Sequence, residues 1–236
     1  MLPAISRSLP VVVACLVGSV AACPSFAEEA VALFNGTSLD GWEGKAEFWS
    51  VQDGAILGLT TPEKPTKGNT FLIYRKAPVG DFELDLDYRI TGGNSGIQYR
   101  SKDMGDAVVG GYQADFEAGT GFSGILYEER GRGILTNRGG RTKIAADGKK
   151  TAGEPIGNAA ELQKAIKPGE WNHYRIVAHG PKLAHFINGQ LMSETVDEEE
   201  GKRAVEGVLA LQLHAGPPMK VEFKDIKLKK LPPAGK

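Results

Sequence analysis

The chain has 236 residues, of which 41% are hydrophobic and 24% are charged, and its formal net charge at pH 7 is −1. This is the composition of an ordinary globular protein of one or at most two domains, and it excludes the disordered and fibrous classes. The 28 basic and 29 acidic side chains nearly cancel, and no long basic run occurs. The chain therefore lacks the positive charge that nucleic-acid binding or polybasic attachment to a membrane requires.

The first 27 residues have the composition of a secretory signal peptide. Only one arginine precedes Glu28, and the segment 9–22 is almost entirely apolar or small. Such a segment is short for a membrane span but suits the core of a signal peptide. The small residues Ser25 and Ala27 predict a cut before Glu28 and therefore an exported protein, periplasmic or extracellular. The alternative is a bacterial lipobox ending at Cys23, which would leave the chain lipid-anchored at that residue.

Strand periodicity dominates residues 28–236, which we expect to form a single β-sandwich domain. Along 82–90, apolar residues alternate strictly with charges, so one face meets a core and the other meets water. This alternation is typical of an antiparallel sheet with one wet face. The number of further strand-like segments predicts an all-β fold of two antiparallel sheets, a sandwich. These segments are 48–51, 55–59, 70–74, 96–100, 112–117, 124–128, 173–178, 208–214 and 221–228.

Two regions interrupt the simple strand pattern. Asn188-Gly189 lies between two apolar runs, which predicts a β-hairpin over 182–192 because both turn positions require positive φ. The region 129–169 is rich in Arg, Lys and Gly, and we interpret it as a long excursion with one short helix at 158–166, capped by Asn158. Its basic residues are expected to face solvent, an anion site being the alternative. A connection of this length is usually a lid, a site wall or a disordered segment.

Three of the predicted strands carry a polar face opposite an apolar one. If they are neighbours in one sheet, the polar faces line a groove with amide, guanidinium, carboxylate and imidazole groups. Such groups suit sugar hydroxyls, each of which both donates and accepts a hydrogen bond. The alternative is that each polar face simply meets solvent, as on 82–90. The polar residues are Gln98 and Arg100 on the first strand, Gln113, Asp115 and Glu117 on the second, and Gln212 and His214 on the third.

Catalytic signatures that can be identified from local sequence are absent. The chain has no Gly-x-Ser-x-Gly, no His-Glu-x-x-His, no phosphate loop and no dinucleotide fingerprint. We interpret His173, His179 and His185 as structural, because they fall on strands without an evident acidic partner. No group of His, Asp and Glu has the tight spacing of a metal site, so no metal and no other cofactor is expected.

Several short motifs occur in a fixed order along nearly all of residues 28–236, and they are specific as a set although each is weak alone. They are Leu33-Phe34-Asn35-Gly36, Leu39-Asp40-Gly41-Trp42, Asp81-Phe82-Glu83-Leu84, Gly92-Gly93-Asn94-Ser95-Gly96-Ile97-Gln98-Tyr99-Arg100, Gly111-Tyr112-Gln113-Ala114-Asp115, Pro168-Gly169-Glu170-Trp171-Asn172, Asn188-Gly189, and the stretch 207–214 followed by Val221-Glu222-Phe223. In this arrangement the chain resembles the 3-keto-disaccharide hydrolase family, long called a domain of unknown function numbered 1080.

The resemblance implies a concanavalin-like jelly roll in exported bacterial proteins, with a carbohydrate groove on the concave sheet. It also implies activity on glycosides or disaccharides already oxidised at C3 of the sugar ring. Carried over position by position, it supplies Asn94, Arg100, Gln113, Asp115, Gln212 and His214, which coincide with the polar faces. Asp115 and His214 are the candidate catalytic residues. The other four, with Gln98 from the polar face, are the candidate substrate contacts, and Tyr127 and Glu128 on the next strand are candidate walls of the groove.

A 3-keto sugar permits cleavage by elimination. The C3 ketone acidifies the C2 proton, so a base can form an enolate that expels the group at C1, and water then adds across the double bond. This route needs a base near C2, donors for the C3 oxyanion and an acid near the leaving oxygen, unlike the two-carboxylate displacement of ordinary glycosidases. His214 or Asp115 is the candidate base, and Arg100 with Gln98 or Gln113 the candidate oxyanion site. The alternatives are a non-catalytic carbohydrate-binding module and a structural cell-surface sandwich.

Overall fold

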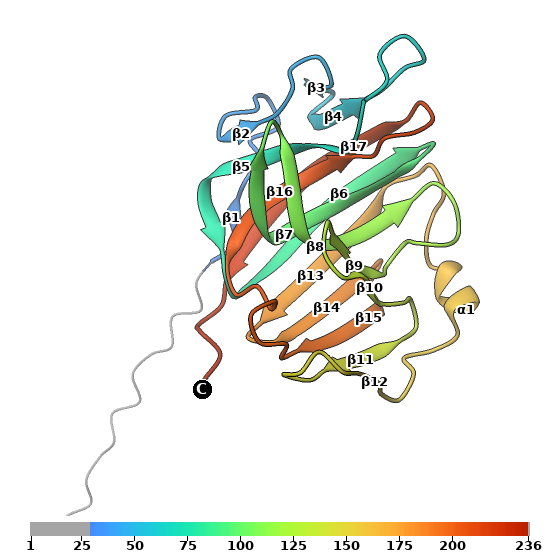
Figure 1. Ribbon diagram of the computed structural model, residues 1–236. Helices are drawn as coiled ribbons and strands as arrows, with labels where there is room; N and C mark the ends of the chain where they lie inside the picture. Colours follow the sequence, from blue (N-terminus) through green and yellow to red (C-terminus); the bar gives the residue numbers. More distant parts are fainter. Residues whose placement is uncertain (1–28, 236) are drawn as a thin grey trace, which may run out of the picture.

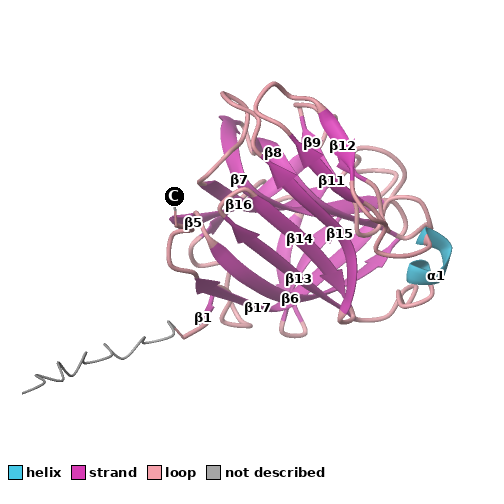
Figure 2. Cartoon of the chain, turned by 90° about the horizontal axis from the view of Figure 1, so that it is seen from below, coloured by secondary structure: helices cyan, strands magenta, loops and turns pink. Residues whose placement is uncertain are grey.

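The computed structural model describes residues 29–235. The expected signal peptide and both candidate cleavage sites therefore lie outside the described residues. Within the described range, seventeen strands form two sheets that pack face to face, and one short helix lies at the edge of the sandwich (Figures 1 and 2). The prediction of an all-β, two-sheet sandwich is confirmed. No helix between residues 29 and 235 has the length and apolar character needed to cross a membrane.

The larger sheet has ten strands and is antiparallel except where β11 pairs with β15. Its strands are, in spatial order, β12 (Lys150–Ala152), β11 (Arg141–Ile144), β15 (Gln190–Asp197), β14 (Lys182–Ile187), β13 (Asn172–His179), β6 (Phe82–Thr91), β17 (Lys220–Lys230), β4 (Ala55–Leu59) and β3 (Trp49–Gln52), with β1 (Val31–Ala32) also paired to β17.

The smaller sheet has seven antiparallel strands, and it brings together the three strands that carry the predicted polar faces. Its strands are, in spatial order, β10 (Gly133–Thr136), β9 (Leu126–Glu129), β8 (Val108–Glu117), β7 (Asn94–Gly105), β16 (Gly207–Leu213), β5 (Thr70–Val79) and β2 (Trp42–Glu43).

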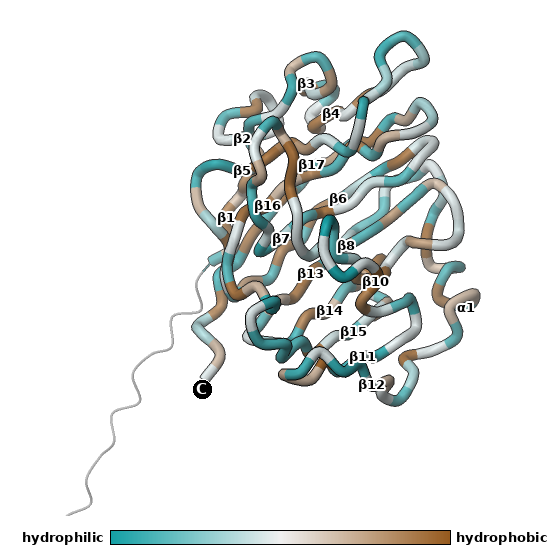
Figure 3. Tube along the Cα trace, in the orientation of Figure 1, coloured by the Kyte–Doolittle hydropathy of each residue, from teal (hydrophilic) through white to brown (hydrophobic). Residues whose placement is uncertain are grey.

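The core lies between the two sheets and follows from the alternation in the sequence. Every second residue of β6 is buried from Phe82 to Ile90, and on β16 Leu209, Leu211 and Leu213 are all fully buried. Figure 3 shows hydrophobic residues recurring along the strands, whereas β11 and β12 at the edge are mainly hydrophilic. The predicted hairpin is also confirmed, because Asn188 and Gly189 join β14 to β15 with φ of 49° and 79°.

The excursion from 129 to 169 contains more regular structure than the sequence predicted. Its short helix is confirmed as α1 (Ala159–Gln163), capped by the Asn158 side chain, which accepts hydrogen bonds from two backbone N–H groups. The region also holds β10, β11 and β12, and the last two extend the larger sheet. The expectation of a solvated basic face is wrong for Arg132 and Arg138. Both are largely removed from solvent, the first by carboxylates and the second by backbone carbonyls.

The smaller sheet is curled, because the β7–β8 hairpin bends back over its own sheet. The Phe71 backbone N–H on β5 donates to the Ala107 carbonyl at the hairpin tip over 2.9 Å, although β16 lies between β5 and β7 in the sheet. Irregular pairing between Tyr99 and Lys102 allows this bend. The hairpin covers a small apolar cluster on this face, which includes Ile73. Only the other half of the concave face stays open.

Candidate functional site

A cavity of about 310 Å³ opens on the uncovered half of the curled sheet. Five of the nine predicted site residues line it, and the two candidate catalytic residues, Asp115 and His214, share it as the alternation predicted. Most of the lining is polar, with an apolar wall on one side. The polar residues are Asn69, Asn94, Gln113, Asp115, Glu117, Tyr127, Glu129 and His214, and the apolar ones are Phe122, Ile125 and Ile134.

Asp115 is a buried carboxyl group that stays protonated at neutral pH. It lies on β8 and is only 6% exposed, and the Asn94 amide donates to its Oδ1 over 2.7 Å. Burial raises the pKa of Asp115 from its ordinary value of 3.8 to about 8, since the Asn94 hydrogen bond offsets this only in part and the nearby Glu117 carboxylate adds to it. Because Oδ1 accepts from Asn94, we assign the proton to Oδ2. Asp115 is therefore equipped to act as an acid.

His214 directly follows β16 and presents one free ring nitrogen. Its Nδ1 lies 2.5 Å from the Ala215 carbonyl oxygen, which can only accept, so Nδ1 carries the hydrogen. In the neutral ring, Nε2 then holds the lone pair and can act as a base. The Ala215 N–H donates to the Asn69 Oδ1 over 3.0 Å, and the Asn69 Nδ2 donates to Glu129 over 3.2 Å. Asn69 thus ties the backbone beside His214 to β9.

Asn69 and Glu129 were not predicted as site residues. Asn69 lies 146 residues from the backbone that it binds, and only the tertiary structure brings the two together. Glu129 belongs to the same face of β9 as Tyr127, so strict alternation from Tyr127 could have found it. Glu117, which also lines the cavity, was placed on the polar face by this alternation.

A ladder of buried amides forms the floor beneath the cavity. The Ser101 hydroxyl donates to Gln98 Oε1 over 2.6 Å, Gln98 Nε2 donates to Gln113 Oε1 over 2.7 Å, and Gln113 Nε2 donates to Gln212 Oε1 over 3.3 Å. The ladder fixes the Gln113 amide with its NH₂ group as the donor. Gln98 and Gln212 are on the predicted face, but the expectation that they line the groove is wrong. They are fully buried on the floor, out of reach of a ligand, and only Gln113 reaches the cavity.

Gly96 makes room for this ladder. A Cβ atom at Gly96 would lie 2.5 Å from both Cγ and Cδ of the Gln113 side chain, which crosses β7 at this point. Gln113 is buried and held at both ends of its amide, so it cannot move aside without losing hydrogen bonds.

We expect Gly96→Ala to lower the free energy of unfolding by about 1–3 kcal/mol, because overpacking must displace Gln113. Urea unfolding followed by fluorescence measures the change. Gly68→Ala is the matched control, since no atom lies within 4 Å of a Cβ placed there. Equal stability of the two variants would show that the ladder tolerates displacement and that the amide floor is not rigid.

Arg100 does not join the cavity, contrary to the prediction from alternation. The pairing irregularity after Tyr99 and a φ of 47° at Arg100 turn its side chain away from Gln98. Its guanidinium is buried and donates to the carbonyls of Gly80 and Gly180 over 2.7 and 2.8 Å and to the Asp81 carboxylate over 2.5 Å. All of these bonds tie loops of the fold together, so we do not assign Arg100 to an oxyanion site.

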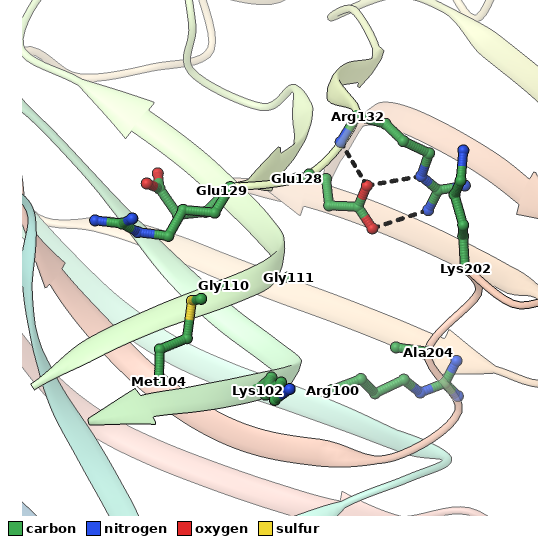
Figure 4. Close-up of a pocket in the computed structure, with 12 residues that line it drawn as sticks. Arg100, Lys102, Met104, Gly110, Gly111, Glu128, Glu129, Arg132, Lys202 and Ala204 are labelled. Carbon is green, nitrogen blue, oxygen red and sulfur yellow. Dashed lines mark hydrogen bonds and ion pairs between the residues drawn. The ribbon is translucent and has the colours of Figure 1, made fainter.

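Glu128 also faces away from the cavity, because it lies on the side of β9 opposite to Tyr127. Its carboxylate accepts three hydrogen bonds from Arg132, two from the guanidinium at 2.6 and 3.0 Å and one from the backbone N–H at 2.7 Å (Figure 4). Arg132 in turn binds Asp197 and Glu199 over 2.6 and 2.7 Å. This network borders a separate cleft of about 470 Å³. The cleft is larger than the cavity, but the charges of its Glu128 and Arg132 compensate each other. The cavity instead contains Asp115, whose pKa is raised, and it is therefore the candidate site.

The remaining histidines lie outside the cavity. His185 is buried between the sheets, bonded to the Tyr99 hydroxyl at 2.9 Å, and burial lowers its pKa to about 4. The expectation that His173 has no acidic partner is wrong, because β13 pairs with β6 and places it 2.9 Å from Asp85 and 3.0 Å from Asp87. Among residues 29–235, no three His, Cys, Asp or Glu side chains gather closely enough to hold a metal ion.

Comparisons with known proteins agree with this fold. The family model of the 3-keto-alpha-glucoside-1,2-lyase-like domain matches residues 29–229. A candidate glycosyl hydrolase of Parabacteroides distasonis superposes with a TM-score of 0.58 at 20% identity, covering 86% of this chain and 100% of that one. The carbohydrate-binding module CBM66 of Bacillus subtilis superposes with a TM-score of 0.54 at 16% identity, covering 80% and 96%.

A third structure, a protein with a galectin-like fold from Bacillus subtilis, superposes with a TM-score of 0.53 at 9% identity, covering 81% of this chain and 90% of that one. At such identities these structures show a shared jelly-roll fold alone. No curated protein sequence matches the chain significantly.

Proposed function

Because the chain belongs to the 3-keto-alpha-glucoside-1,2-lyase-like family, we propose that its cavity cleaves glycosides oxidised at C3 by elimination and rehydration. The observation that carries this proposal is the presence of an acid and a base in one cavity. Asp115 is protonated at neutral pH, and His214 presents a free Nε2. Elimination across C1 and C2 requires this pair, since one group must take a proton while the other gives one.

In the first step, His214 Nε2 removes the C2 proton and the electron pair moves onto the C3 oxygen. The oxyanion needs hydrogen-bond donors that are already oriented. The Gln113 NH₂ group, held by the amide ladder, is one donor. The Tyr127 hydroxyl is the second, and because burial raises its pKa it stays protonated and able to donate. Gln113 was one of the predicted oxyanion donors, and Tyr127 replaces Arg100 as its partner in this proposal.

In the second step, the enolate re-forms the ketone, a double bond forms between C1 and C2, and the bond from C1 to the leaving oxygen breaks. Asp115 Oδ2 gives its proton to that oxygen. Water then adds at C1 while the Asp115 carboxylate takes one of its protons, and protonated His214 returns a proton to C2. Both side chains thus regain their starting protonation states, and the sum of the steps is hydrolysis.

The direct test is product formation from 3-keto-trehalose, with unoxidised trehalose as the control. The proposal predicts release of glucose from the oxidised sugar only, since trehalose has no acidic C2 proton. If the folded protein cleaves none of the 3-keto-glycosides tried, the proposed enzymatic function is rejected.

We further propose that the protein acts outside the cytoplasm, as the composition of residues 1–27 suggests. Mass spectrometry of the protein from its native host is expected to find Glu28 at the N-terminus. A lipid-bearing peptide beginning at Cys23 would instead support the membrane-anchored alternative.

A second candidate function is carbohydrate binding without catalysis. The observation that favours it is the aromatic side chain of Phe122, which is 48% exposed at the cavity. Exposed rings beside polar groups suit sugar recognition in binding modules as well as in enzymes. Retained affinity for oligosaccharides, together with no turnover of any 3-keto-glycoside, would favour this candidate.

A further inference from the structure

Phe122 is exposed to solvent although the loop that carries it is tightly held. This loop, residues 118–124, joins β8 to β9 and is called the Phe122 loop below. The Glu117 carboxylate accepts hydrogen bonds from the backbone N–H groups of Gly121 and Phe122, the latter over 2.9 Å. The Gly124 N–H donates to the Asp115 carbonyl over 2.8 Å. The loop is thus fixed to the same strand that carries the Asp115 carboxyl.

A buried arginine holds the loop from its other side. Arg138 donates to the carbonyls of Thr120 and Ser123, each over 2.7 Å, and its Nε donates to the Ala159 carbonyl over 3.0 Å. Its side chain is thereby bonded entirely to backbone oxygens, two of which belong to the Phe122 loop. Fixing a loop costs conformational entropy, and a well-packed core residue would normally offset that cost. Ile125, which follows the Phe122 loop directly before β9, is 2% exposed and supplies such burial, whereas Phe122 does not. An exposed aromatic ring that is held rigidly at a cavity points to a role in binding.

The position of Phe122 defines what it can bind. It lies at the cavity together with Ile134, which is 40% exposed, and their apolar surface faces a lining that is otherwise mainly polar. A sugar ring combines an apolar C–H face with hydroxyls at its rim, and it can satisfy both kinds of surface at once. An aromatic leaving group has no hydroxyls and would leave Asn69 and Glu129 without partners from the ligand.

We propose that Phe122, together with Ile134 in the lining of the same cavity, is a stacking subsite for the sugar ring of the leaving group. This inference rests on the proposed function, because the leaving group is defined only if the glycosidic bond is cleaved beside Asp115. The subsite acts on the leaving group alone. Its loss should therefore affect substrates that carry a second sugar ring and spare those that do not.

The experiment compares kcat/KM for 3-keto-trehalose, methyl 3-keto-α-glucoside and phenyl 3-keto-α-glucoside in each variant. Phe122→Ala is expected to lower the value for 3-keto-trehalose roughly 3-fold to 10-fold, mainly through KM, and to leave the methyl glycoside unchanged. Phe122→Tyr should retain the value of the parent protein. Met104→Ala is the matched control, because Met104 is 53% exposed and lines the separate cleft of Figure 4. It should change kcat/KM for none of the three glycosides.

An equal loss for all three glycosides would overturn the proposal, because Phe122 would then be a general wall of the cavity. A loss confined to the phenyl glycoside would also overturn it, in favour of an aromatic leaving group. If no glycoside is cleaved, the proposed function fails separately, and the subsite is decided by affinity. In calorimetric titrations, Phe122→Ala should then bind trehalose more weakly than the parent protein does and bind methyl α-glucoside equally well. Unchanged affinity for trehalose would reject the subsite.

Discussion

Asp115→Asn is expected to lower kcat roughly a hundredfold to ten-thousandfold, because it removes the proton that the leaving oxygen must receive. Asn has the shape of Asp and can keep the hydrogen bond from Asn94, so substrate affinity should change little. The parent protein should also lose activity above pH 8, since the pKa of Asp115 is about 8 and only the protonated form is an acid. A pH profile of kcat/KM between pH 6 and 10 measures this fall.

The same substitution is expected to stabilise the fold. In the folded chain Asp115 binds its proton more tightly than in the unfolded chain, where its pKa is close to 3.8. The folded state therefore holds more protons between about pH 4 and pH 8, and the free energy of unfolding falls as the pH rises through that window. The fall is at most about 1.4 kcal/mol for each pH unit. Asp115→Asn has no such dependence and should unfold at higher urea concentration than the parent at pH 8.

Asp106→Asn is the control for both measurements. Asp106 lies at the tip of the β7–β8 hairpin, its side chain is 83% exposed, and its ion pair with Lys45 is a surface pair of small worth. This variant should match the parent in activity and in its pH dependence of stability. Greater loss of stability in Asp115→Asn than in Asp106→Asn at pH 8 would contradict the view that a buried neutral acid fills the site.

His214→Gln is expected to lower the rate of C2 proton removal, again roughly a hundredfold to ten-thousandfold. This step can be observed without cleavage of a glycosidic bond, because 3-keto-glucose has no second sugar to lose but still has an acidic C2 proton. In D₂O the parent protein should accelerate the loss of the C2 proton signal of 3-keto-glucose, measured by NMR. His214→Gln should abolish that acceleration, whereas Asp115→Asn should retain most of it.

His173→Gln is the matched control for this exchange, since His173 is an exposed histidine on the outer face of the other sheet. It should exchange as fast as the parent. The assignment of roles would be reversed if Asp115→Asn lost the exchange and His214→Gln kept it. Asp115 would then be the base, which was the alternative left open by the sequence.

Alternation along regular strands predicted the fold and part of the site. Asp115 and His214 lie in one cavity because the pairing of β8 is regular from Tyr112 to Glu117 and that of β16 from Leu209 to Leu213, directly before His214. The same reasoning placed Arg100 wrongly, because the pairing with β8 becomes irregular directly after Tyr99. A β-bulge interrupts regular strand pairing and bends the sheet, and the local sequence does not reveal where it occurs.

The sequence also did not reveal which of the polar residues on the predicted face are buried. Gln98 and Gln212 are on the predicted face, yet both are fully buried within the amide ladder, which forms only when β7, β8 and β16 pair in the folded sheet. The role of Asn69 depends in the same way on long-range packing. Glu128 was misplaced because a wall residue was inferred from its neighbour Tyr127, although adjacent residues of a strand face opposite sides.

The most direct test of the account is cleavage of 3-keto-trehalose in D₂O, with the released 3-keto-glucose examined at early conversion. Excess substrate then occupies the cavity and limits later exchange of the product. His214 is exposed, so its captured proton exchanges with solvent before rehydration. Elimination followed by rehydration predicts deuterium at C2 of the first product formed. Rapid cleavage that yields product with hydrogen retained at C2 would contradict the elimination mechanism and indicate direct displacement at C1.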